Sequence, residues 1–493
     1  MPSSPKLKRR FDRIHPLDQL EVTLVRAATE RSSWLTPAAL NALRCVLSLA
    51  RIEVVPTPDG EVSLDGAFDA LRARVVESLE PLMLESGGVI EYDEVASTVP
   101  FLTDLAERAR RDTLARFAGR LAPEHLDAEM CHKVLVVVAG GGGGSGYVYG
   151  GAFKLLHELG AAPSMIVGTS IGSLLGLFRA RNRDLVLDPL VSLADRISWR
   201  SVFMLPAVRN RYGVPATLRL YLRKTIAHLF QHPTEGRTLR LAELPIPFRV
   251  VVAGLSGTGL THDLSYYEHL ADGVIGQARP SWSALRRTVG GVAGALTDLV
   301  QRPSVLKEIV LGGDELTGRF DVVDAVGFST AVPGLIHYDI LRDDPHMHGL
   351  MEKLFARHGV VRLLDGGLVN NVPSRVAWTH VQRGDLKTRN AFVLAMDCFA
   401  PQLARNVLMH PIQRLVRPQV AANAPYAGFT KTFMHVLSPL DVVPDARKVD
   451  QALRAGYREL ENERALIGEM LRPLRGLDGA WSDAGPPKVV KSA

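Results

Sequence analysis

The residues best suited to chemistry stand at positions 168–172, which read Gly-Thr-Ser-Ile-Gly and fit the pattern G-x-S-x-G. An apolar run at 164–167 precedes them and an apolar segment follows, which predicts a sharp turn from a strand into a helix. Gly168 and Gly172 would leave room there for a serine in a strained backbone conformation. Ser170 would then lie at a helix N-terminus, where the helix dipole favours developing negative charge. These features favour Ser170 as a nucleophile.

A run of glycines lies upstream, at residues 141–144. It follows the apolar run 134–138, which is typical of a strand buried in a parallel sheet. Acyl transfer passes through an oxyanion that needs backbone N–H donors about 3 Å away, and glycines that open a helix present such donors without side chains. Because both loops are expected at the carboxyl edge of one sheet, the glycines would lie beside Ser170.

The same glycines also satisfy a nucleotide-binding pattern, since Gly141, Gly143 and Gly146 fit G-x-G-x-x-G after a strand. A dinucleotide site needs an acidic residue about 20 positions further on. No Asp or Glu occurs between Glu158 and Asp184, and no Gly-Lys-Ser/Thr of a P-loop follows the glycines. The sequence therefore does not favour nucleotide binding.

Three motifs in this order resemble the patatin-like phospholipase family. Residues 141–156 are similar to its glycine-rich oxyanion loop, residues 168–172 to its G-T-S-x-G elbow, and residues 365–367, Asp-Gly-Gly, to its D-G-G motif. Further similarity lies at residues 245–248, 328–333 (similar to the family's A-S-x-x-x-P segment) and 456–457. The resemblance covers about residues 133 to 460, and the three motifs together are specific although each alone is not.

The resemblance implies roles by position. Ser170 would be the nucleophile and Asp365 the base that accepts its proton, so that no histidine is required. The N–H groups of three glycines would bind the oxyanion: Gly142, Gly143 and Gly144. Gly366 and Gly367 would let the chain turn sharply beside another loop.

The implied function is hydrolysis of lipid acyl esters through a covalent acyl-serine intermediate, of the phospholipase A or lysophospholipase kind. A triacylglycerol lipase of the same family is an alternative. A catalytically weak, lipid-binding scaffold is another, because family members usually have Arg or Lys where this chain has Ser145. The expected partner is a phospholipid or another acyl lipid, and no metal, organic cofactor or nucleic acid is expected.

A Ser-Asp-His triad of the α/β-hydrolase type is a further alternative. His380, His410 and His435 follow Asp365 in the chain order that such an enzyme requires. The triad accounts for the elbow at Ser170 but not for the position of the glycine run.

These motifs need an α/β framework to position them. Strands are predicted at residues 134–138, 164–167, 248–253, 362–364 and 392–396, and helices at 147–159 and from 171 onward. Their alternation predicts a three-layer α/β/α domain with a mainly parallel sheet over residues 131–462. Proline-interrupted insertions are predicted at about 185–240 and 262–318, and they lengthen the interval between Ser170 and Asp365 beyond the family's usual spacing.

Residues 1–130 are predicted to form a helical accessory region without a recognisable chemical motif. Thr36 and Pro37 are typical of an N-cap and a first helical position, opening a helix over residues 38–50. Further helices are expected after residue 65 and around 102–121. The composition of the tail, residues 463–493, predicts partial disorder.

The bulk composition fits a globular enzyme, since 493 residues with 46% apolar side chains can fill a large core. The three cysteines form no metal-binding or disulfide spacing, which favours a reducing compartment. The N-terminal basic cluster is not followed by an apolar signal segment, and the uncharged stretches 134–153 and 159–178 fit strand-loop-helix units better than membrane spans. A cytoplasmic protein is therefore expected.

Peripheral contact with a membrane surface is also expected. The net charge of +6 is compatible with anionic lipid. The insertions contain Trp199, Trp282, Arg286, Arg287 and an apolar run at 289–296, a mixture that suits a lipid–water interface. Ordinary packing of these loops on the sheet is the alternative.

Overall fold

The computed structural model describes residues 4–31, 33–85, 89–187, 192, 198–204, 211–213, 216–257, 305–341, 343–400 and 410–477. The chain divides into two compact units. One contains residues 136–377 and 394–461, and the other contains the residues up to 135, residues 378–393 and those from 462 onward.

A mainly parallel sheet forms the centre of the first unit. Its strands are β3 (Val134–Ala139), β4 (Pro163–Thr169), β7 (Phe248–Ser256), β8 (Leu306–Leu311), β10 (Val360–Asp365), β11 (Ala391–Asp397) and β12 (Phe429–Thr432). They lie in the order β10-β7-β4-β3-β11-β12, with β8 paired to β7 as well. Parallel pairs join β4 to β7 and β11 to β12, whereas β8 and β10 run antiparallel to β7. All five predicted strands are confirmed.

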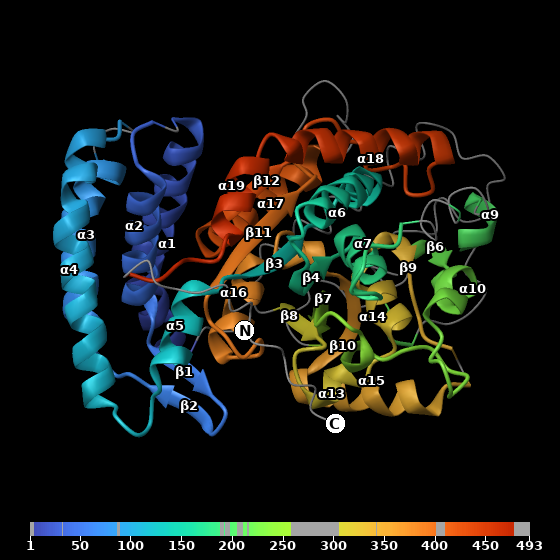
Figure 1. Ribbon diagram of the computed structural model, residues 1–493. Coiled ribbons are helices and arrows are strands. Elements are labelled where there is room, and N and C mark those ends of the chain that lie inside the picture. The colour runs from blue at the N-terminus through green and yellow to red at the C-terminus, as the bar shows by residue number, and fades with distance from the viewer. Residues whose placement is uncertain are drawn as a thin grey trace. The chain divides into compact units, whose positions relative to one another are not determined.

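Helices cover the sheet on both sides. The first unit contains α6 (Val148–Glu158), α7 (Ile171–Ala180), α9 (Trp199–Val202), α10 (Leu222–Ile226), α13 (Glu315–Gly318), α14 (Val322–Ser329), α15 (Pro345–His358), α17 (His410–Asn423) and α18 (Ala446–Glu461). The helix α6 connects β3 to β4, and α7 follows β4. Figure 1 shows α6, α7 and α18 above the strands and α15 below them. The predicted three-layer α/β/α fold is confirmed.

Regular structure replaces parts of the predicted insertions. Within 185–240, β6 (Ala216–Leu220) joins β5 (Phe203–Met204) and β9 (Gly334–His337) in a small second sheet. Within 262–318, β8 belongs to the central sheet. Lys307 and Glu308 interrupt the apolar pattern of β8. The strand accommodates them because Lys307 donates to the His358 carbonyl and Glu308 accepts from Asn370. Residues 258–304, with Trp282, Arg286, Arg287 and the run 289–296, lie outside the described residues.

Short 3-10 helices complete this unit: η2 (Gly143–Tyr147), η3 (Ala227–Phe230), η4 (Leu241–Glu243), η5 (Gly366–Leu368) and η6 (Ala424–Tyr426). Two of them follow strands of the central sheet at its carboxyl edge. These are η2, which begins within the glycine run after β3, and η5, which continues directly from β10. The motifs that suggested chemistry therefore lie on turns at strand ends.

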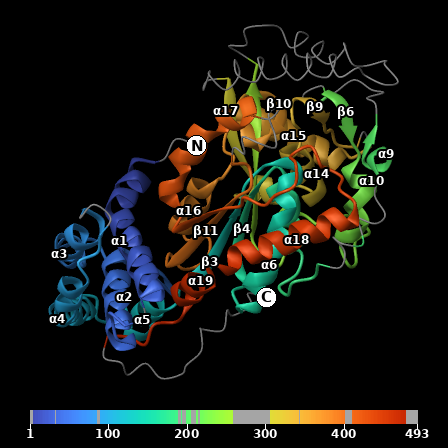
Figure 2. The same cartoon turned by 90° about the horizontal axis from the view of Figure 1, so that it is seen from above.

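The helix α18 packs closely on α6, as Figure 1 and Figure 2 both show. Glycines occur on both sides of the contact. A Cβ atom at Gly151 would collide with the Leu453 carbonyl oxygen, and one at Gly456 with the Val148 carbonyl oxygen. The absence of both side chains lets the two backbones approach each other.

The second unit is mainly helical. It contains α1 (Pro5–Glu30), α2 (Pro37–Arg51), α3 (Asp69–Glu80), a π-helical turn η1 (Pro81–Glu85), α4 (Tyr92–Arg116), α5 (Pro123–Cys131) and α19 (Arg464–Leu471), with a hairpin of β1 (Val54–Thr57) and β2 (Gly60–Ser63). The helix α16 (Ser374–Arg383) ends in this unit. The predicted cap is confirmed, since the Thr36 side chain accepts a hydrogen bond from Ala39 N–H. The helices share an apolar core that includes Leu20, Leu43, Leu71, Leu102 and Leu126.

A buried carboxylate lies within this helical unit. Glu21 is fully buried and forms ion pairs with Arg44, Arg51 and Lys133. Burial alone would raise the pKa of Glu21, but the three cations hold it well below its usual range. The network therefore keeps a charge inside the unit by pairing it.

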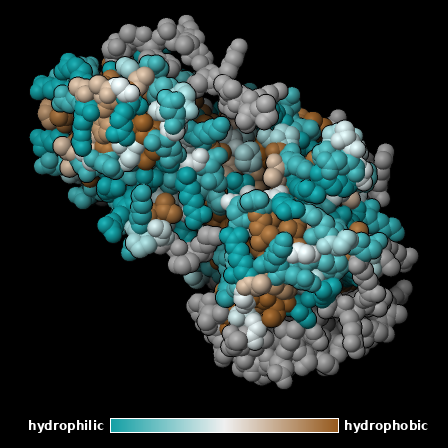
Figure 3. Space-filling model, turned by 90° about the horizontal axis from the view of Figure 1, so that it is seen from below, coloured by the Kyte–Doolittle hydropathy of each residue, from teal (hydrophilic) through white to brown (hydrophobic). Residues whose placement is uncertain are grey.

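No described helix is long and apolar enough to cross a membrane. Figure 3 shows a face on which hydrophilic residues predominate and hydrophobic ones form separate patches. Exposed large apolar side chains include Phe101, Trp199, Leu341, Met434 and Leu440.

The close contact between α6 and α18 predicts a steric effect on stability. Gly456→Ala should lower the free energy of unfolding by about 1–3 kcal/mol, because the new Cβ meets backbone that cannot move aside cheaply. Gly349→Ala is the matched control, since nothing lies within 4 Å of a Cβ at this position in α15, and it should be neutral or stabilising by about 0.5–1 kcal/mol. Urea unfolding midpoints would measure both, and equal effects would contradict the steric explanation.

Candidate active site

The predicted nucleophile elbow is a strained turn. Ser170 joins β4 to α7 with φ of 53° and ψ of −129°, a left-handed conformation that is rare outside glycine. A Cβ at Gly172 would collide with the Ala139 carbonyl oxygen, and one at Gly168 would lie 2.6 Å from Ser173 Cα. Side chains at these two positions would prevent the turn, as the sequence pattern predicts.

The sheet brings Ser170 and Asp365 together through a single strand. Along β7, Val251 pairs with Thr169 of β4, and the next residue, Val252, pairs with Asp365 of β10. Because β8 occupies the other edge of β7 over the same residues, β4 and β10 share one edge. One runs parallel to β7 and the other antiparallel, so their carboxyl ends meet head to head.

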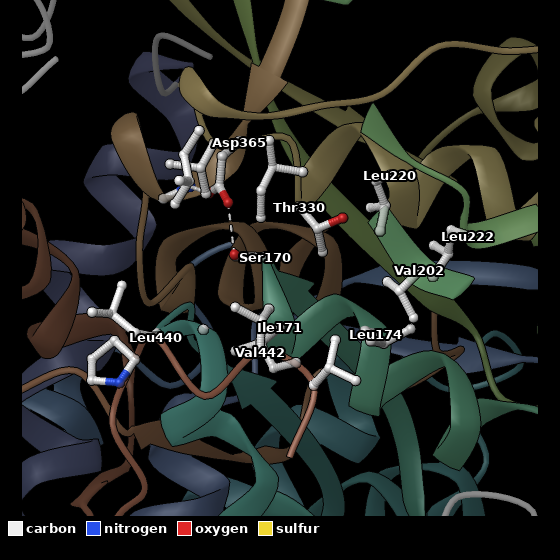
Figure 4. Close-up of a pocket in the computed structure, with 18 of the residues that line it drawn as sticks. Ser170, Ile171, Leu174, Val202, Leu220, Leu222, Thr330, Asp365, Leu440 and Val442 are labelled. Carbon is white, nitrogen blue, oxygen red and sulfur yellow. Dashed lines mark hydrogen bonds between the residues drawn. The ribbon is translucent and has the colours of Figure 1, made fainter. Parts of the chain in front are cut away.

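The side chains of these two residues are hydrogen-bonded. Ser170 Oγ donates to Asp365 Oδ2 at 2.6 Å, as Figure 4 shows. The other carboxylate oxygen, Oδ1, accepts from Gly367 N–H at 2.7 Å. A Cβ at Gly366 would collide with the Val251 carbonyl oxygen, so the D-G-G turn requires this glycine at the edge of β7.

Burial sets the basicity of Asp365. Only 6% of the residue is exposed, and burial raises its pKa to about 6, against the opposing effect of the hydrogen bonds from Ser170 and Gly367. A carboxylate with this pKa is ionised at neutral pH and is a stronger base than an exposed aspartate. It can therefore accept a proton from the serine hydroxyl that donates to it.

The glycine run lies beside Ser170, and its amides differ in their partners. Gly141 N–H donates to the Asn371 carbonyl, and Gly144 N–H donates to the Pro439 carbonyl at 3.0 Å. Within the described part of the chain, the N–H groups of Gly142 and Gly143 have no acceptor. Gly142 and Gly143 line the same pocket as Ser170. Two of the three predicted oxyanion donors are thus available, whereas the Gly144 amide is already bonded.

Ser145 occupies the position at which the resemblance led us to expect a cation. Its side chain is buried and its hydroxyl donates to the Leu437 carbonyl at 2.9 Å. Together with the bond from Gly144 to Pro439, this contact fastens the glycine run to residues 437–439. Ser145 therefore fixes the loop by a neutral hydrogen bond.

Sequence reasoning missed two residues that hold the site together. Asn371 anchors the glycine run, because its carbonyl accepts from Gly141 N–H and its side-chain amide approaches the Gly141 carbonyl at 3.4 Å. Ser329, at the end of α14, accepts a hydrogen bond from Ser170 N–H at 2.9 Å. The signal for Asn371 was a pair of asparagines shortly after the D-G-G motif, and Ser329 lies in the segment 328–333 already noted as similar to the family.

The pocket at Ser170 and Asp365 is mostly apolar. One wall comes from α7, α9, the small second sheet and α10, and includes Leu174, Val202, Leu220 and Leu222. Figure 4 shows these residues to one side of the Ser170–Asp365 pair and Leu440 to the other. Val202, Leu220 and Leu222 are buried, whereas Leu440 is 46% exposed. The pocket therefore has a buried apolar side and an open side.

The histidines of the alternative triad have other surroundings. His380 Nδ1 lies 2.7 Å from Asp385 Oδ2. The His435 side chain is largely exposed and lies against Glu459, and the His410 side chain is outside the described residues. No histidine is found among the described residues that line the pocket. The observed partner of the serine hydroxyl is Asp365.

Comparison with known proteins gives one family match. A family model described as patatin-like phospholipase matches residues 136–378. A search of curated proteins finds no significant match to the chain. The matched range includes the glycine run, the elbow and the D-G-G turn, and it ends before residues 437–439.

The raised pKa of Asp365 predicts a pH dependence of Ser170 reactivity. The ionised carboxylate is the form that accepts a proton, so the rate of labelling by a neutral fluorophosphonate should rise with pH through about 6. The rate should be about tenfold lower at pH 5 than at pH 7, with circular dichroism confirming the same fold at both values. An aspartate at its ordinary pKa would instead give nearly equal rates, and that result would contradict the assignment.

Proposed function

Because residues 136–378 form a patatin-like phospholipase domain, we propose that the protein hydrolyses carboxylic esters of lipids, phospholipids above all, through a Ser170–Asp365 dyad. The family as a whole implies lipid acyl hydrolysis. The observation that carries the proposal is the 2.6 Å hydrogen bond from Ser170 Oγ to a buried carboxylate inside an apolar pocket.

In the proposed reaction, Ser170 Oγ attacks the ester carbonyl while its proton passes to Asp365. The tetrahedral oxyanion accepts hydrogen bonds from Gly142 and Gly143 N–H, and the lack of any other acceptor for them among the described residues supports this role. Asp365 then gives the proton to the departing alcohol oxygen, which leaves an acyl-Ser170 ester. A water molecule deprotonated by Asp365 hydrolyses that ester, and the proton returns to Ser170.

The pocket supports a lipid acyl chain as the group bound beside Ser170. Its buried side, with Val202, Leu220 and Leu222, would take the chain, and each methylene removed from water contributes about 0.8 kcal/mol. The open side, at Leu440, would face the rest of the lipid. Leu440 is an exposed apolar side chain that lines this edge of the pocket, where it would contact the apolar part of the bound lipid.

Two alternatives are separated by their substrates. A triacylglycerol lipase would use the same Ser170 and the same pocket, and would cleave neutral acylglycerols faster than phospholipids. A non-catalytic lipid-binding scaffold would hydrolyse neither. Ser145 does not favour the scaffold, because its hydrogen bond to Leu437 supports the loop that carries Gly142 and Gly143.

Removing either member of the dyad tests the proposal. Ser170→Ala should abolish fluorophosphonate labelling, and both Ser170→Ala and Asp365→Asn should lower the hydrolysis of phospholipid esters by about 10³-fold or more. The asparagine retains the shape of the side chain but cannot accept the serine proton. Release of fatty acid from mixed micelles would measure the rates.

Histidine variants serve as controls for this experiment. His380→Ala and His435→Ala should retain labelling and hydrolysis, since neither side chain lines the pocket. A loss of about 10³-fold at either position would favour the Ser-Asp-His triad instead. Full activity of Asp365→Asn would also overturn the dyad.

The proposed chain-binding side predicts a change in acyl-length preference. Leu220→Trp should fill part of the pocket, so that kcat/KM for long-chain esters falls by about fourfold for each methylene displaced. Esters with short acyl chains should be affected little. Leu341→Trp is the control, because this exposed leucine is outside the pocket lining. Equal losses for all chain lengths in Leu220→Trp would argue against acyl binding on this side.

A further inference from the structure

One short segment contacts both members of the proposed dyad. At the C-terminal end of α14, Ser329 Oγ accepts a hydrogen bond from Ser170 N–H at 2.9 Å. Two residues later, the Ala331 carbonyl accepts a hydrogen bond from Asp365 N–H at 2.8 Å. Thr330, between them, lines the pocket and is drawn beside Ser170 in Figure 4.

The hydroxyl of Ser329 is itself held in place. Ser329 is fully buried, and its Oγ donates to the Val251 carbonyl at 2.7 Å. Val251 is the residue of β7 that pairs with Thr169, immediately before the elbow. The Ser170 amide is thus tied to the central sheet through one side-chain oxygen, which accepts from the elbow and donates to the strand.

This contact stabilises the strained backbone of the elbow. Ser170 is in a left-handed conformation, and such conformations persist only where the surroundings impose them. Its N–H group is buried, and a buried N–H without a partner is costly. Without the Ser329 hydroxyl, the backbone at Ser170 would relax, and the 2.6 Å contact between Oγ and Asp365 would lengthen.

We propose that Ser329 is a positioning residue that fixes the Ser170 backbone so that its hydroxyl meets Asp365. The inference rests on the proposed hydrolase function and adds a residue to it. Ser329 is not among the described residues that line the pocket, and its hydrogen bonds join Ser170 N–H and the Val251 carbonyl, so its effect would reach the reaction through Ser170. A displacement of about 1 Å in such a contact can lower a rate by about 10²-fold.

The test compares Ser329→Ala with wild type and with a matched control. Ser329→Ala should lower the fluorophosphonate labelling rate and kcat by about 10- to 100-fold, while KM stays within about twofold. The pH midpoint should rise above about 6, because the Ser170 hydroxyl that lowers the pKa of Asp365 would lie farther from it. Ser374→Ala removes another buried serine hydroxyl, one without a hydrogen-bond partner among the described residues, and should leave both rates unchanged. A general loosening of the domain would raise KM or expose Asp365 and so lower the pH midpoint, and either outcome would overturn the positioning role.

A second variant keeps the test decisive if Ser329→Ala does not fold. Ser329→Cys is similar in volume but offers a weaker, longer contact to the Ser170 amide, and should label several-fold more slowly than wild type. Labelling at the wild-type rate by either folded variant would overturn this inference alone. A wild-type protein that neither labels nor hydrolyses lipid esters would overturn the proposed function, and this inference with it.

Discussion

The arrangement of the site depends on two consecutive residues in the middle of β7. Val251 pairs with the end of β4 and Val252 with the end of β10, so one strand edge receives two chain ends that arrive from opposite directions. The Val251 carbonyl also accepts the Ser329 hydroxyl and leaves no space for a side chain at Gly366. The peptide unit between Val251 and Val252 therefore positions the strained serine, the aspartate and the turn that follows the aspartate. Residues 195 positions apart reach hydrogen-bond distance through this shared edge.

Two buried carboxylates in this chain show how surroundings set acidity. Glu21 lies in the helical unit among Arg44, Arg51 and Lys133, and these cations lower its pKa despite complete burial. Asp365 forms no ion pair with any cation in the part of the chain that the structure describes, and burial raises its pKa to about 6. The cations around Glu21 keep it ionised, whereas the burial of Asp365 yields a group that can exchange a proton near neutral pH. The second environment is the one expected of a general base.

Local patterns in the sequence predicted the strands that carry the site, the elbow and the D-G-G turn, because glycine and apolar runs report backbone geometry directly. Contacts made by main-chain carbonyls could not be predicted in this way, because they do not depend on the type of side chain. The Pro439 carbonyl that binds Gly144 N–H could belong to any residue, so the sequence did not distinguish Gly144 from Gly142 and Gly143. The strand β8 escaped prediction because Lys307 and Glu308 have partners on neighbouring segments that only the fold reveals.

The fastening of the glycine run by residues 437–439 bears on where this domain can be cut. The family match ends at residue 378, but the Leu437 and Pro439 carbonyls that hold Ser145 and Gly144 come from much later in the chain. A fragment trimmed to the matched range would keep Ser170 and Asp365. It would lose the carbonyl groups that support the glycine run, which is the loop proposed to bind the oxyanion. The segment that supports the glycine run therefore extends well past the region that sequence similarity identifies.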